Sequence, residues 1–552
     1  MKFNQGKSAA LALSLVALTG GIASAQHTFD GNIVFGNNPG PCTAGGSATF
    51  DACGLIAAFP NNDTTTDPQL GAPFNTLAPN WVPANSSIAS FVNDNVVSVV
   101  RPADACFTCG PCPTVLEAAC FRGAIPPAQL GDDWTQGWTD YTFDGTGRVY
   151  PTRPVVILQG EQFANYTMTA ANHYLLRGRV DFEAGTTLTI EPGVFVFGEN
   201  STVGTLVIER GARLIAEGTR TAPIVLTTDL APGSMVPGGW GGLVINGRAI
   251  ANCADCVNGV SCVSEGTAVE YCGNNDCDDS GSLRFVRVEF AGRIAGLNNE
   301  LNSFTFNGLG CGTRSEYLQA HRGLDDLFEW FGGKHEARYL VGTGGQDDGL
   351  DWQMGWRGAV QFAVIQQYGD NSDKGIEADN NEFDFNAPCR SNPTIANVTL
   401  LATAVGTNTH GIHLRRGTDA TIVNSIVMGW PSTGIRVQNN ETSARGFNPV
   451  PAVLCSPAGV DPSEVASLDV RTFPNPVVRE ARFFFSLPTS GRAQIQVFDA
   501  NGRLVSNVLD AELAEGSHTA TWNVPADAAS GAYFYRVQSN DRVSTGRLIA
   551  AR

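Results

Sequence analysis

Short segments in which every second residue is apolar recur along the middle of the chain, between about residues 155 and 440, and turns containing glycine separate them. Two of these segments align directly: TLTIEPG (187–193) and TLVIERG (205–211) start 18 residues apart. Alternation with a period of two predicts β-strands with one buried face. The short spacing leaves no room for a crossover helix between successive strands. The pattern therefore predicts a coil of stacked strands and excludes a doubly wound sheet.

The repeat continues with longer units, and one apolar position can be followed through five of them. The segments DLFEW, DGLDW, KGIEA, GIHLR and GIRVQ align on Phe328, Leu350, Ile376, Ile412 and Ile435. Repeats of about 20 to 25 residues built from strands and turns are typical of solenoids, in which each rung buries its apolar side against the next. We therefore predict an all-β fold in which residues 151–440 form a right-handed parallel β-helix.

Acidic residues occupy the next position in three of these rungs. Glu329, Asp351 and Glu377 follow the buried residues directly, and His413 takes this position one rung later. Strands of neighbouring rungs lie about 4.8 Å apart, so the three carboxylates are expected to form an outward row. Further charged residues flank this row: Asp379 and Arg415 along the same strands, Asp325, Asp326, Asp347 and Asp348 at the adjoining turns, and Arg322 and Arg416 nearby.

Carboxylates at this spacing repel one another, so they need cations, arginine partners or raised pKa values. In one hypothesis the row binds Ca²⁺ or a similar hard cation, which prefers carboxylate oxygens. In a second, two of the acids act as general acid and base on a polysaccharide. In a third, the row is solvated, pairs with Arg322, Arg415 and Arg416, and only keeps the surface hydrophilic. The sequence leaves all three open and assigns no catalytic residue.

Residues 1–25 form a predicted signal peptide. Lys2 and Lys7 precede a short apolar run, and Ala23, Ser24 and Ala25 supply the small residues typical of a cleavage site. No later segment is apolar over the length needed to span a bilayer, so we predict no transmembrane segment in the mature chain. The net charge of −18 argues against nucleic-acid binding, which requires a basic surface.

All 14 cysteines follow the predicted signal peptide. An even number in an exported chain predicts disulfides, although the spacing of Cys106, Cys109 and Cys112, with Cys120 close behind, also suits a metal or an iron–sulfur cluster. The pairing cannot be deduced from the sequence. Residues 26–150 contain six of the cysteines and lack clear periodicity, so we predict an irregular, disulfide-braced N-terminal region or cap.

The C-terminal part of the chain differs in composition. Residues 441–467 contain several prolines, serines and alanines without periodicity and are predicted to be a linker. Short strands separated by turns in residues 468–552 predict a small immunoglobulin-like β-sandwich. FPNP (473–476), VFDANGRLV (497–505) and SGAYFY (530–535) resemble, in this order, motifs of the C-terminal sorting domain of type IX secretion cargo. The resemblance points to Phe473, Pro474, Asn475, Pro476, Asp499, Gly502, Arg503, Gly531 and Tyr533.

This resemblance implies that type IX secretion machinery carries the chain through the periplasm and across the outer membrane. Such cargo is released or joined to surface lipopolysaccharide, and the sorting domain is usually removed. The central region resembles exported β-helix proteins of Bacteroidetes-like bacteria through GWGGLVINGR (239–248), HRGLDDLFEWFGG (321–333), DKGIEADN (373–380) and GIHLRRGT (411–418).

We therefore predict a secreted or cell-surface protein that acts by adhesion, display, or binding of a cation, a glycan or another surface polysaccharide, without turnover. The alternative is a polysaccharide-degrading hydrolase or lyase. Asp347-Asp348 and His410-Gly411 are similar to the Asp pair and the His-Gly of polygalacturonase-like hydrolases, although 62 residues separate Asp348 from His410.

Overall fold

The computed structural model describes residues 132–253, 260–296, 299–403 and 409–445, Cys256, most of 470–550 and shorter stretches between residues 28 and 126. The chain forms two compact units, Met1–Cys455 and Ser456–Arg552. The predicted signal peptide, Cys42, Cys53, Cys106, Cys109, Cys112, Cys120 and Cys455, most of the predicted linker, Pro474, Asn475, Pro476 and Gly502 lie outside the described residues.

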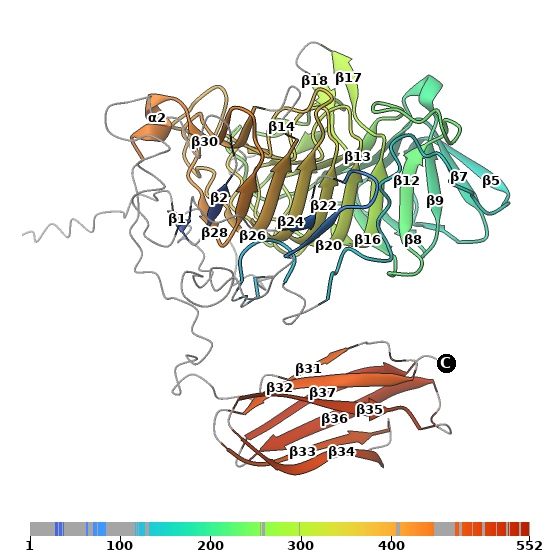
Figure 1. Ribbon diagram of the computed structural model, residues 1–552. Helices are drawn as coiled ribbons and strands as arrows, with labels where there is room; N and C mark the ends of the chain where they lie inside the picture. Colours follow the sequence, from blue (N-terminus) through green and yellow to red (C-terminus); the bar gives the residue numbers. More distant parts are fainter. Residues whose placement is uncertain are drawn as a thin grey trace, which may run out of the picture. The chain divides into compact units, whose positions relative to one another are not determined.

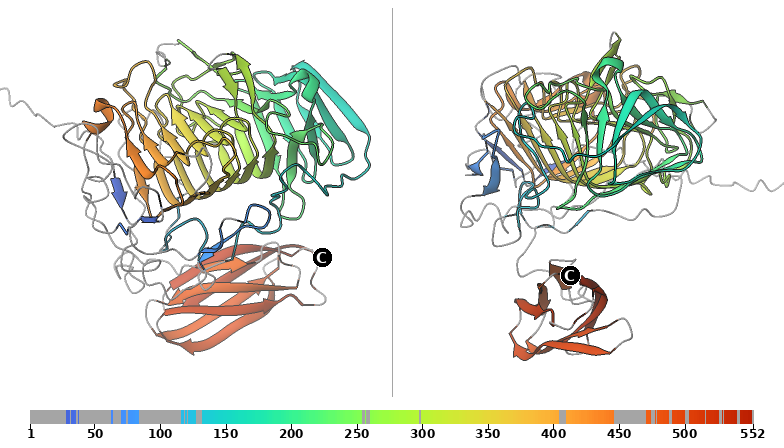
Figure 2. Two further views of the ribbon diagram at one scale, coloured as in Figure 1. Left: turned by 45° about the horizontal axis from the view of Figure 1, so that its top comes forward. Right: turned by 90° about the vertical axis from the view of Figure 1, so that its right-hand side faces the viewer.

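The first unit is a right-handed parallel β-helix, as the repeat predicts. Its strands wind into three faces and stack along the coil axis (Figures 1 and 2). The first face contains the end of β7 (His173–Phe182), β10 (Thr205–Ile208), β13 (Gly242–Asn246), β19 (Phe304–Asn307), β21 (Phe328–Phe331), β23 (Leu350–Gln353), β25 (Ile376–Ala378), β27 (His410–Leu414) and β30 (Thr433–Val437).

The second and third faces share five long strands: β16 (Gly281–Glu289), β20 (Arg314–His321), β22 (Glu336–Thr343), β24 (Ala359–Gln367) and β26 (Thr394–Ala402). Each bends at one residue with a φ between 48° and 60°, which turns the strand from one face to the next. These corner residues are Phe285, Tyr317, Tyr339, Phe362 and Asn397.

Shorter strands complete both faces. β6 (Tyr166–Met168), β8 (Thr187–Ile190), β11 (Arg213–Glu217) and β28 (Thr421–Val423) belong to the second face. β9 (Phe195–Gly198), β12 (Ile224–Thr228) and β29 (Ile426–Met428) belong to the third. β5 (Val155–Gln162) pairs with β7 at the start of the coil. Helix α2 (Asn440–Ser443) follows β30.

The core is one continuous column of apolar side chains inside the coil. Phe328, Leu350 and Ile376 are aligned by the pairing of β21, β23 and β25 and are fully buried, which confirms the repeat alignment. Trp330 and Trp352 also lie inside, as period-two alternation requires. Because each rung covers its neighbour, no rung has an independent core.

Part of the N-terminal region joins the far end of the coil. β1 (Thr28–Asp30) and β2 (Ile33–Phe35) pair in parallel with β28 and β29, although nearly 400 residues separate them. Between these strands, Asn32 donates a hydrogen bond to the Ile422 carbonyl and accepts one from the Ser425 backbone N–H. These pairs occupy backbone groups that an edge strand leaves open. The boundaries 26–150 and 151–440 stay predictions.

Another N-terminal segment covers the corner between the second and third faces. The corner rings of Phe285, Tyr317 and Tyr339 form a stack with 4.5 Å between successive centroids. Trp134 and Trp138 meet this stack edge-on. β3 (Leu70–Ala72) and β4 (Asn80–Pro83) form a separate antiparallel pair. The aromatic stack is therefore an internal contact and not an exposed binding platform.

Two short antiparallel pairs project from the coil as insertions. β14 (Cys262–Val263) pairs with β15 (Glu270–Tyr271), and β17 (Arg293–Gly296) pairs with β18 (Asn299–Leu301). Figure 1 shows β17 and β18 extending beyond the stacked strands.

The second unit consists of two antiparallel sheets around one apolar core. β31 (Val470–Phe473), β32 (Glu480–Leu487) and β35 (Gly516–Asn523) form one sheet. β34 (Leu504–Leu513), β33 (Gly491–Phe498), β36 (Gly531–Ser539) and β37 (Arg542–Ala550) form the other. Phe483, Ile495 and Trp522 are buried between them, as in the predicted small sandwich.

The described residues of the sorting motif lie in the core, at a turn and at strand ends of this unit. Tyr533 is buried, and its ring lies 5.5 Å from that of Trp522. Asp499 and Arg503 close the turn after β33, because the backbone N–H of each donates to an oxygen of the other. Phe473 ends β31, and Gly531 begins β36.

Candidate acidic site

The acidic row has the register that the sequence predicts. Glu329 pairs with Asp351, Asp351 with Glu377, Glu377 with His413, and His413 with Arg436 in the next rung. The row lies on the outer side of the first face, but Glu329, Asp351 and Glu377 are only 4%, 8% and 6% exposed. The hypothesis of a solvated row is therefore wrong for these three side chains.

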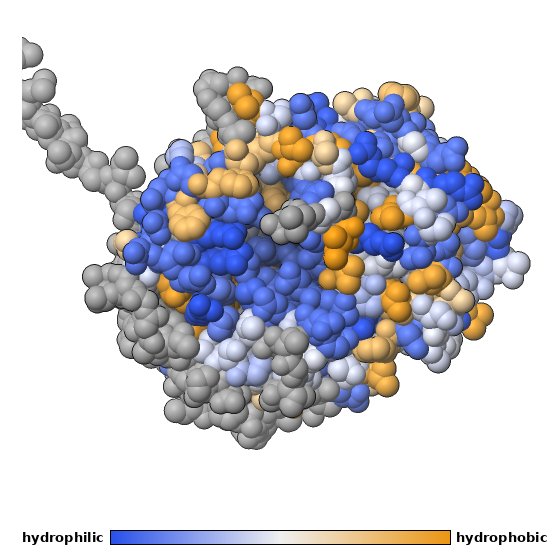
Figure 3. Space-filling model, turned by 90° about the horizontal axis from the view of Figure 1, so that it is seen from above, coloured by the Kyte–Doolittle hydropathy of each residue, from blue (hydrophilic) through white to orange (hydrophobic). Residues whose placement is uncertain are grey.

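Turns and insertions bury the row. The Asp325 backbone packs against both ends of the β17–β18 hairpin, where Gly292 leaves room for it. Glu265, in the turn of the β14–β15 insertion, accepts a hydrogen bond from the Glu300 backbone N–H of β18. Figure 3 views the molecule from the side toward which this hairpin projects, and shows a hydrophilic hollow with hydrophobic patches around it.

One end of the row contains only acids and amides. Carboxylate oxygens of Asp326, Glu329 and Asp351 all lie within 4.8 Å of one another, and we call these three residues the acid-only group. Glu329 accepts hydrogen bonds from the amides of Asn302 and Gln353. The Oδ1 atom of Asp351 is buried without a hydrogen-bond partner. Among the described residues, no basic side chain forms an ion pair with the acid-only group.

The other end contains a buried lysine. The Lys374 ammonium lies 2.6 Å from Glu377 Oε1 and 3.5 Å from Asp348 Oδ2, and it also contacts Asp373. We call Lys374 and these three acids the Lys374 group. Lys374 is only 8% exposed. Its amine donates a hydrogen bond to Asp373 and forms ion pairs with Asp348 and Glu377.

Arginines neutralise the acids next to the Lys374 group. Arg415 contacts Glu377 and forms two hydrogen bonds to Asp379, at 2.7 and 3.0 Å. Arg416 donates to the same Asp379 carboxylate at 2.9 Å. The arginine-paired hypothesis therefore describes this end of the row correctly, but it does not describe the acid-only group.

Two predicted neighbours have other partners. Arg322 pairs with Asp370 at 2.6 Å and stacks on the Phe143 ring, so it does not neutralise the row. His413 Nε2 lies 2.7 Å from Gln438 Oε1, and its Nδ1 is 3.9 Å from Glu377.

The pKa shifts reflect the same division. Burial, with the charges of neighbouring carboxylates, raises the pKa values of Asp326, Glu329 and Asp351 well above their usual range. Burial also acts on Lys374 and by itself would lower its pKa, but Asp348 and Asp373 outweigh this effect and raise it. Lys374 is therefore a protonated counter-ion at neutral pH.

Acids around the acid-only group are perturbed in the same direction. Burial and the Asp347 charge raise the pKa of Asp325. Burial and the Glu300 charge raise the pKa of Glu265 to about 7, although a backbone hydrogen bond opposes the shift. Asp325 and Asp347 come within 4.8 Å of Asp326, and both are only partly buried. They connect the buried acids to the surface.

The sequence reasoning did not select Lys374, although the rung alignment contains a signal for it. Asp326, Asp348 and Lys374 each precede the interior residue of their rung by two positions. The Asp348 backbone N–H donates to Asp326 Oδ1, and the Lys374 backbone N–H donates to Asp348 Oδ1. A lysine in this column therefore had to face the aspartates. Gln353 follows Asp351 by two positions on β23, and Asn302 precedes Phe304 by two positions, as Asp326 precedes Phe328. Glu265 and Glu300 come from insertions, and no repeat register could place them.

The polygalacturonase-like residues lie on rungs that are not adjacent. The rung containing Lys374 lies between Asp348 and His410, because the Gly375 N–H donates to the His410 carbonyl. His410 Nδ1 lies 2.9 Å from Thr433 Oγ1, and its Nε2 lies 3.1 Å from Arg436. Both ring nitrogens are therefore engaged.

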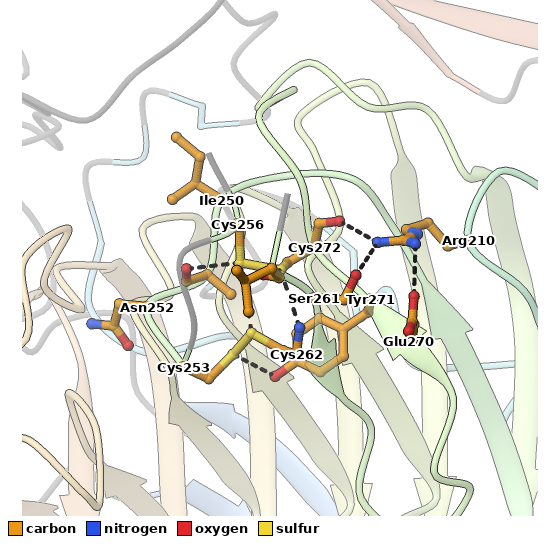
Figure 4. The surroundings of a disulfide bond; sticks show 12 residues. Arg210, Ile250, Asn252, Cys253, Cys256, Ser261, Cys262, Glu270, Tyr271 and Cys272 are labelled. Carbon is orange, nitrogen blue, oxygen red and sulfur yellow. Dashed lines mark hydrogen bonds and ion pairs between the residues drawn. A yellow bond between two sulfur atoms is a disulfide. The ribbon is translucent and has the colours of Figure 1, made fainter. Parts of the chain in front are cut away.

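Four cysteines in and around the β14–β15 insertion form crossed disulfides. Cys253 pairs with Cys262 and Cys256 with Cys272, which ties the insertion around β14 and β15 together (Figure 4). Beside it, Arg210 donates to Ser261, to the Cys272 carbonyl and to Glu270. Cys277, Cys311 and Cys389 are disulfide-bonded as well. The described cysteines are arranged as the disulfide hypothesis predicts, and the metal alternative at Cys106–Cys120 lies outside them.

Together these features define an exported parallel β-helix protein with a buried acidic row. Residues 160–460 match the pectate-lyase-like β-helix domain family, which is more than half of the chain, so the protein belongs to this family. Residues 471–551 match the secretion system C-terminal sorting domain. This domain indicates handling by type IX secretion and export to the cell surface or beyond.

No curated protein matches the chain, and no solved structure matches it. Among the described residues, no helix combines the length and the apolar character needed to cross a bilayer.

Proposed function

We propose that this exported protein is a non-enzymatic binding protein whose acid-only group holds one hard divalent cation of the Ca²⁺ kind. The row would then support display or adhesion outside the cell, where such cations are available. The observation that carries the proposal is the buried Asp351 carboxylate, whose Oδ1 has no hydrogen-bond partner among the described residues.

The chemistry of the group favours a hard cation. Ionised carboxylates removed from water cost free energy unless they are paired. Asp326, Glu329 and Asp351 offer oxygens within 4.8 Å of one another, and Ca²⁺ takes six to eight oxygen ligands from such groups. Imidazole and thiolate ligands, which softer metals prefer, are absent from this set of three residues. The donors therefore favour Ca²⁺ or Mg²⁺ over zinc or copper.

Other features of the site argue against turnover. A general acid or base must reach the substrate within hydrogen-bond distance. Glu329 and Asp351 are buried beneath the insertions, and Lys374 is held protonated by its carboxylate partners. These residues suit ion binding better than proton exchange with a long polymer.

Cation binding is tested on the full chain after treatment with a chelator. Equilibrium dialysis against Ca²⁺ should give one bound ion per chain, and Glu329→Gln should abolish this binding. Glu270→Gln is the matched control, because it makes the same change at an exposed acid paired with Arg210. Absence of Ca²⁺ and Mg²⁺ binding by the natural chain would refute the proposal.

The enzymatic alternative needs a separate assay. The full chain is incubated with a panel of acidic polysaccharides, with and without chelator, and the formation of new reducing ends and of unsaturated sugars is measured. No product is expected. Product formation that Glu329→Gln abolishes and Glu270→Gln retains would establish catalysis at this site and overturn the non-enzymatic part of the proposal.

A further inference from the structure

The Lys374 ammonium takes the place that a cation would occupy in the second half of the row. Asp348, Asp351 and Glu377 are buried and bring carboxylate oxygens within 4.8 Å of one another. Lys374 Nζ contacts two of these three acids, Asp348 at 3.5 Å and Glu377 at 2.6 Å. Its single positive charge therefore sits against a ligand set of the same kind as the acid-only group.

The rung repeat places this ammonium there. Lys374 occupies the position that aspartate holds in the two preceding rungs, at Asp326 and Asp348. The backbone N–H of Lys374 repeats the bond that Asp348 makes, each donating to the carboxylate one rung before. The rung is therefore built like its neighbours, and only the charge of one side chain is reversed.

A second observation points to a ligand beside the ammonium. Asp351 belongs to both sets of three acids, and its buried Oδ1 has no hydrogen-bond partner among the described residues. Arg415 and Lys374 act on Asp351 through their charges, but Lys374 forms no ion pair with Asp351 within 4.0 Å, so the Oδ1 atom has room for a cation as its direct ligand. A carboxylate can bridge two ions through its two oxygens.

We propose that Lys374 closes a second divalent-cation site formed by Asp348, Asp351 and Glu377, so that the natural chain binds one ion and a chain without this ammonium binds two. This inference rests on the proposed function, because the one ion expected in the natural chain is the ion of the acid-only group. The second site would take the same class of hard cation, because its ligands are again carboxylates alone.

The test counts ions in variants of the full chain. Equilibrium dialysis with Ca²⁺ gives the stoichiometry, and Tb³⁺ luminescence on titration serves as an independent count. Lys374→Gln should raise the number of bound ions from one to two. Lys334→Gln is the control, because it removes another buried lysine from the turn after β21, outside both sets of acids. It should leave the number at one.

Loss of Lys374 leaves buried acids without their partner, so a second variant protects the test against misfolding. Asp373→Asn combined with Lys374→Gln removes one charge of each sign and keeps Asp348, Asp351 and Glu377. Circular dichroism verifies the fold, and this double variant should also bind two ions. The same number of ions in the natural chain and in the folded double variant would overturn the inference.

The two proposals fail in distinguishable ways. A natural chain that binds one ion, with a folded double variant that also binds one, removes the closed site and keeps the proposed function. A natural chain that binds none, with a double variant that binds one, removes the proposed function and keeps the closed site. Absence of binding in both folded proteins overturns both.

Discussion

The two halves of the acidic row have the same scaffold but different means of holding buried charge. In the Lys374 group, an internal ammonium and Arg415 neutralise the carboxylates. In the acid-only group, amides donate to Glu329, but no basic side chain among the described residues pairs with the three acids. The carboxylates of the Lys374 group are thus neutralised by the chain itself, whereas those of the acid-only group would be stabilised by a bound cation.

The comparison shows how a β-helix can vary function without changing its fold. Asp326, Asp348 and Lys374 stand in one column, and the backbone N–H groups of Asp348 and Lys374 make equivalent bonds to the rung before. Changing a single side chain in this column converts an acidic rung into one that carries its own cation. The coil sets the spacing between the carboxylates. The residue at each rung determines whether a basic side chain of the protein or a bound cation neutralises them.

The largest expected effect is the loss of the internal cation. Lys374→Ala leaves Asp348 and Glu377 buried without their ammonium, and removing one partner of a buried ion pair costs about 3–5 kcal/mol. Urea unfolding of the chelated full chain, followed by tryptophan fluorescence, measures the difference. Lys374→Arg keeps the charge and should lose less. A Lys374→Ala midpoint equal to that of the natural chain would contradict the division of the row.

The next largest effect is removal of the cation from the acid-only group. A ligand at 100 times its dissociation constant stabilises the folded state by about 2.7 kcal/mol, so a chelator should lower the melting temperature of the chain. Scanning calorimetry with and without Ca²⁺ measures this shift. Glu329→Gln should melt at the same temperature in both conditions, while Glu270→Gln should respond like the natural chain. An equal response in all three proteins would exclude the acid-only group as the binding site.

A smaller effect is a different pH dependence of stability in the acid-only group and in the Lys374 group. The folded pKa values of Asp326, Glu329 and Asp351 lie above the unfolded values of about 4, so folding takes up protons between the two. Stability of the chelated chain is therefore complete below pH 4 for these groups and falls as pH rises through their folded pKa values, by about 1.4 kcal/mol for each pKa unit.

Calcium should reverse this trend, because it binds the ionised carboxylates. The melting shift on adding Ca²⁺ should therefore be larger at pH 7.5 than at pH 5. Asp373 differs: burial raises its pKa, but the Lys374 charge and hydrogen bonds from Lys374 and Thr409 together lower it. Its contribution is present above the usual aspartate pKa and lost only in acid. A Ca²⁺ shift that is independent of pH would contradict the raised pKa values of the acid-only group.

The sequence predicted the coil and the register of the row, because both follow from periodicity. Phe328, Leu350 and Ile376 were aligned from apolar alternation alone, and their stacking placed Glu329, Asp351 and Glu377 in one line. The depth of the row could not be predicted in the same way. The row is buried by insertions that interrupt the repeat. The position of an insertion relative to the rungs cannot be deduced from the repeat.

The partners of each acid were also only partly predictable. Arg415 was expected beside Asp379, since both follow the interior residues of neighbouring rungs by three positions, and the structure pairs them. Arg322 was expected at the row but turns toward Asp370. Its backbone has a φ of 58°, which redirects the chain at this corner. Side-chain direction at a corner depends on backbone geometry that alternation does not encode.

The smallest expected effect is a pair of isosteric changes with opposite signs. In the chelated chain, Asp351→Asn removes a buried charge that has no ion pair, so it should raise stability by about 1 kcal/mol. Glu377→Gln removes a charge that Lys374 and Arg415 both contact, so it should lower stability by a similar or larger amount. Urea unfolding of both variants under one set of conditions compares them directly. Adding saturating Ca²⁺ should then reverse the order for Asp351→Asn, because this variant loses a ligand to the ion. If both changes were destabilising without the cation, Asp351 would have to be neutralised by a group of the chain itself, and the contrast between the two halves would disappear.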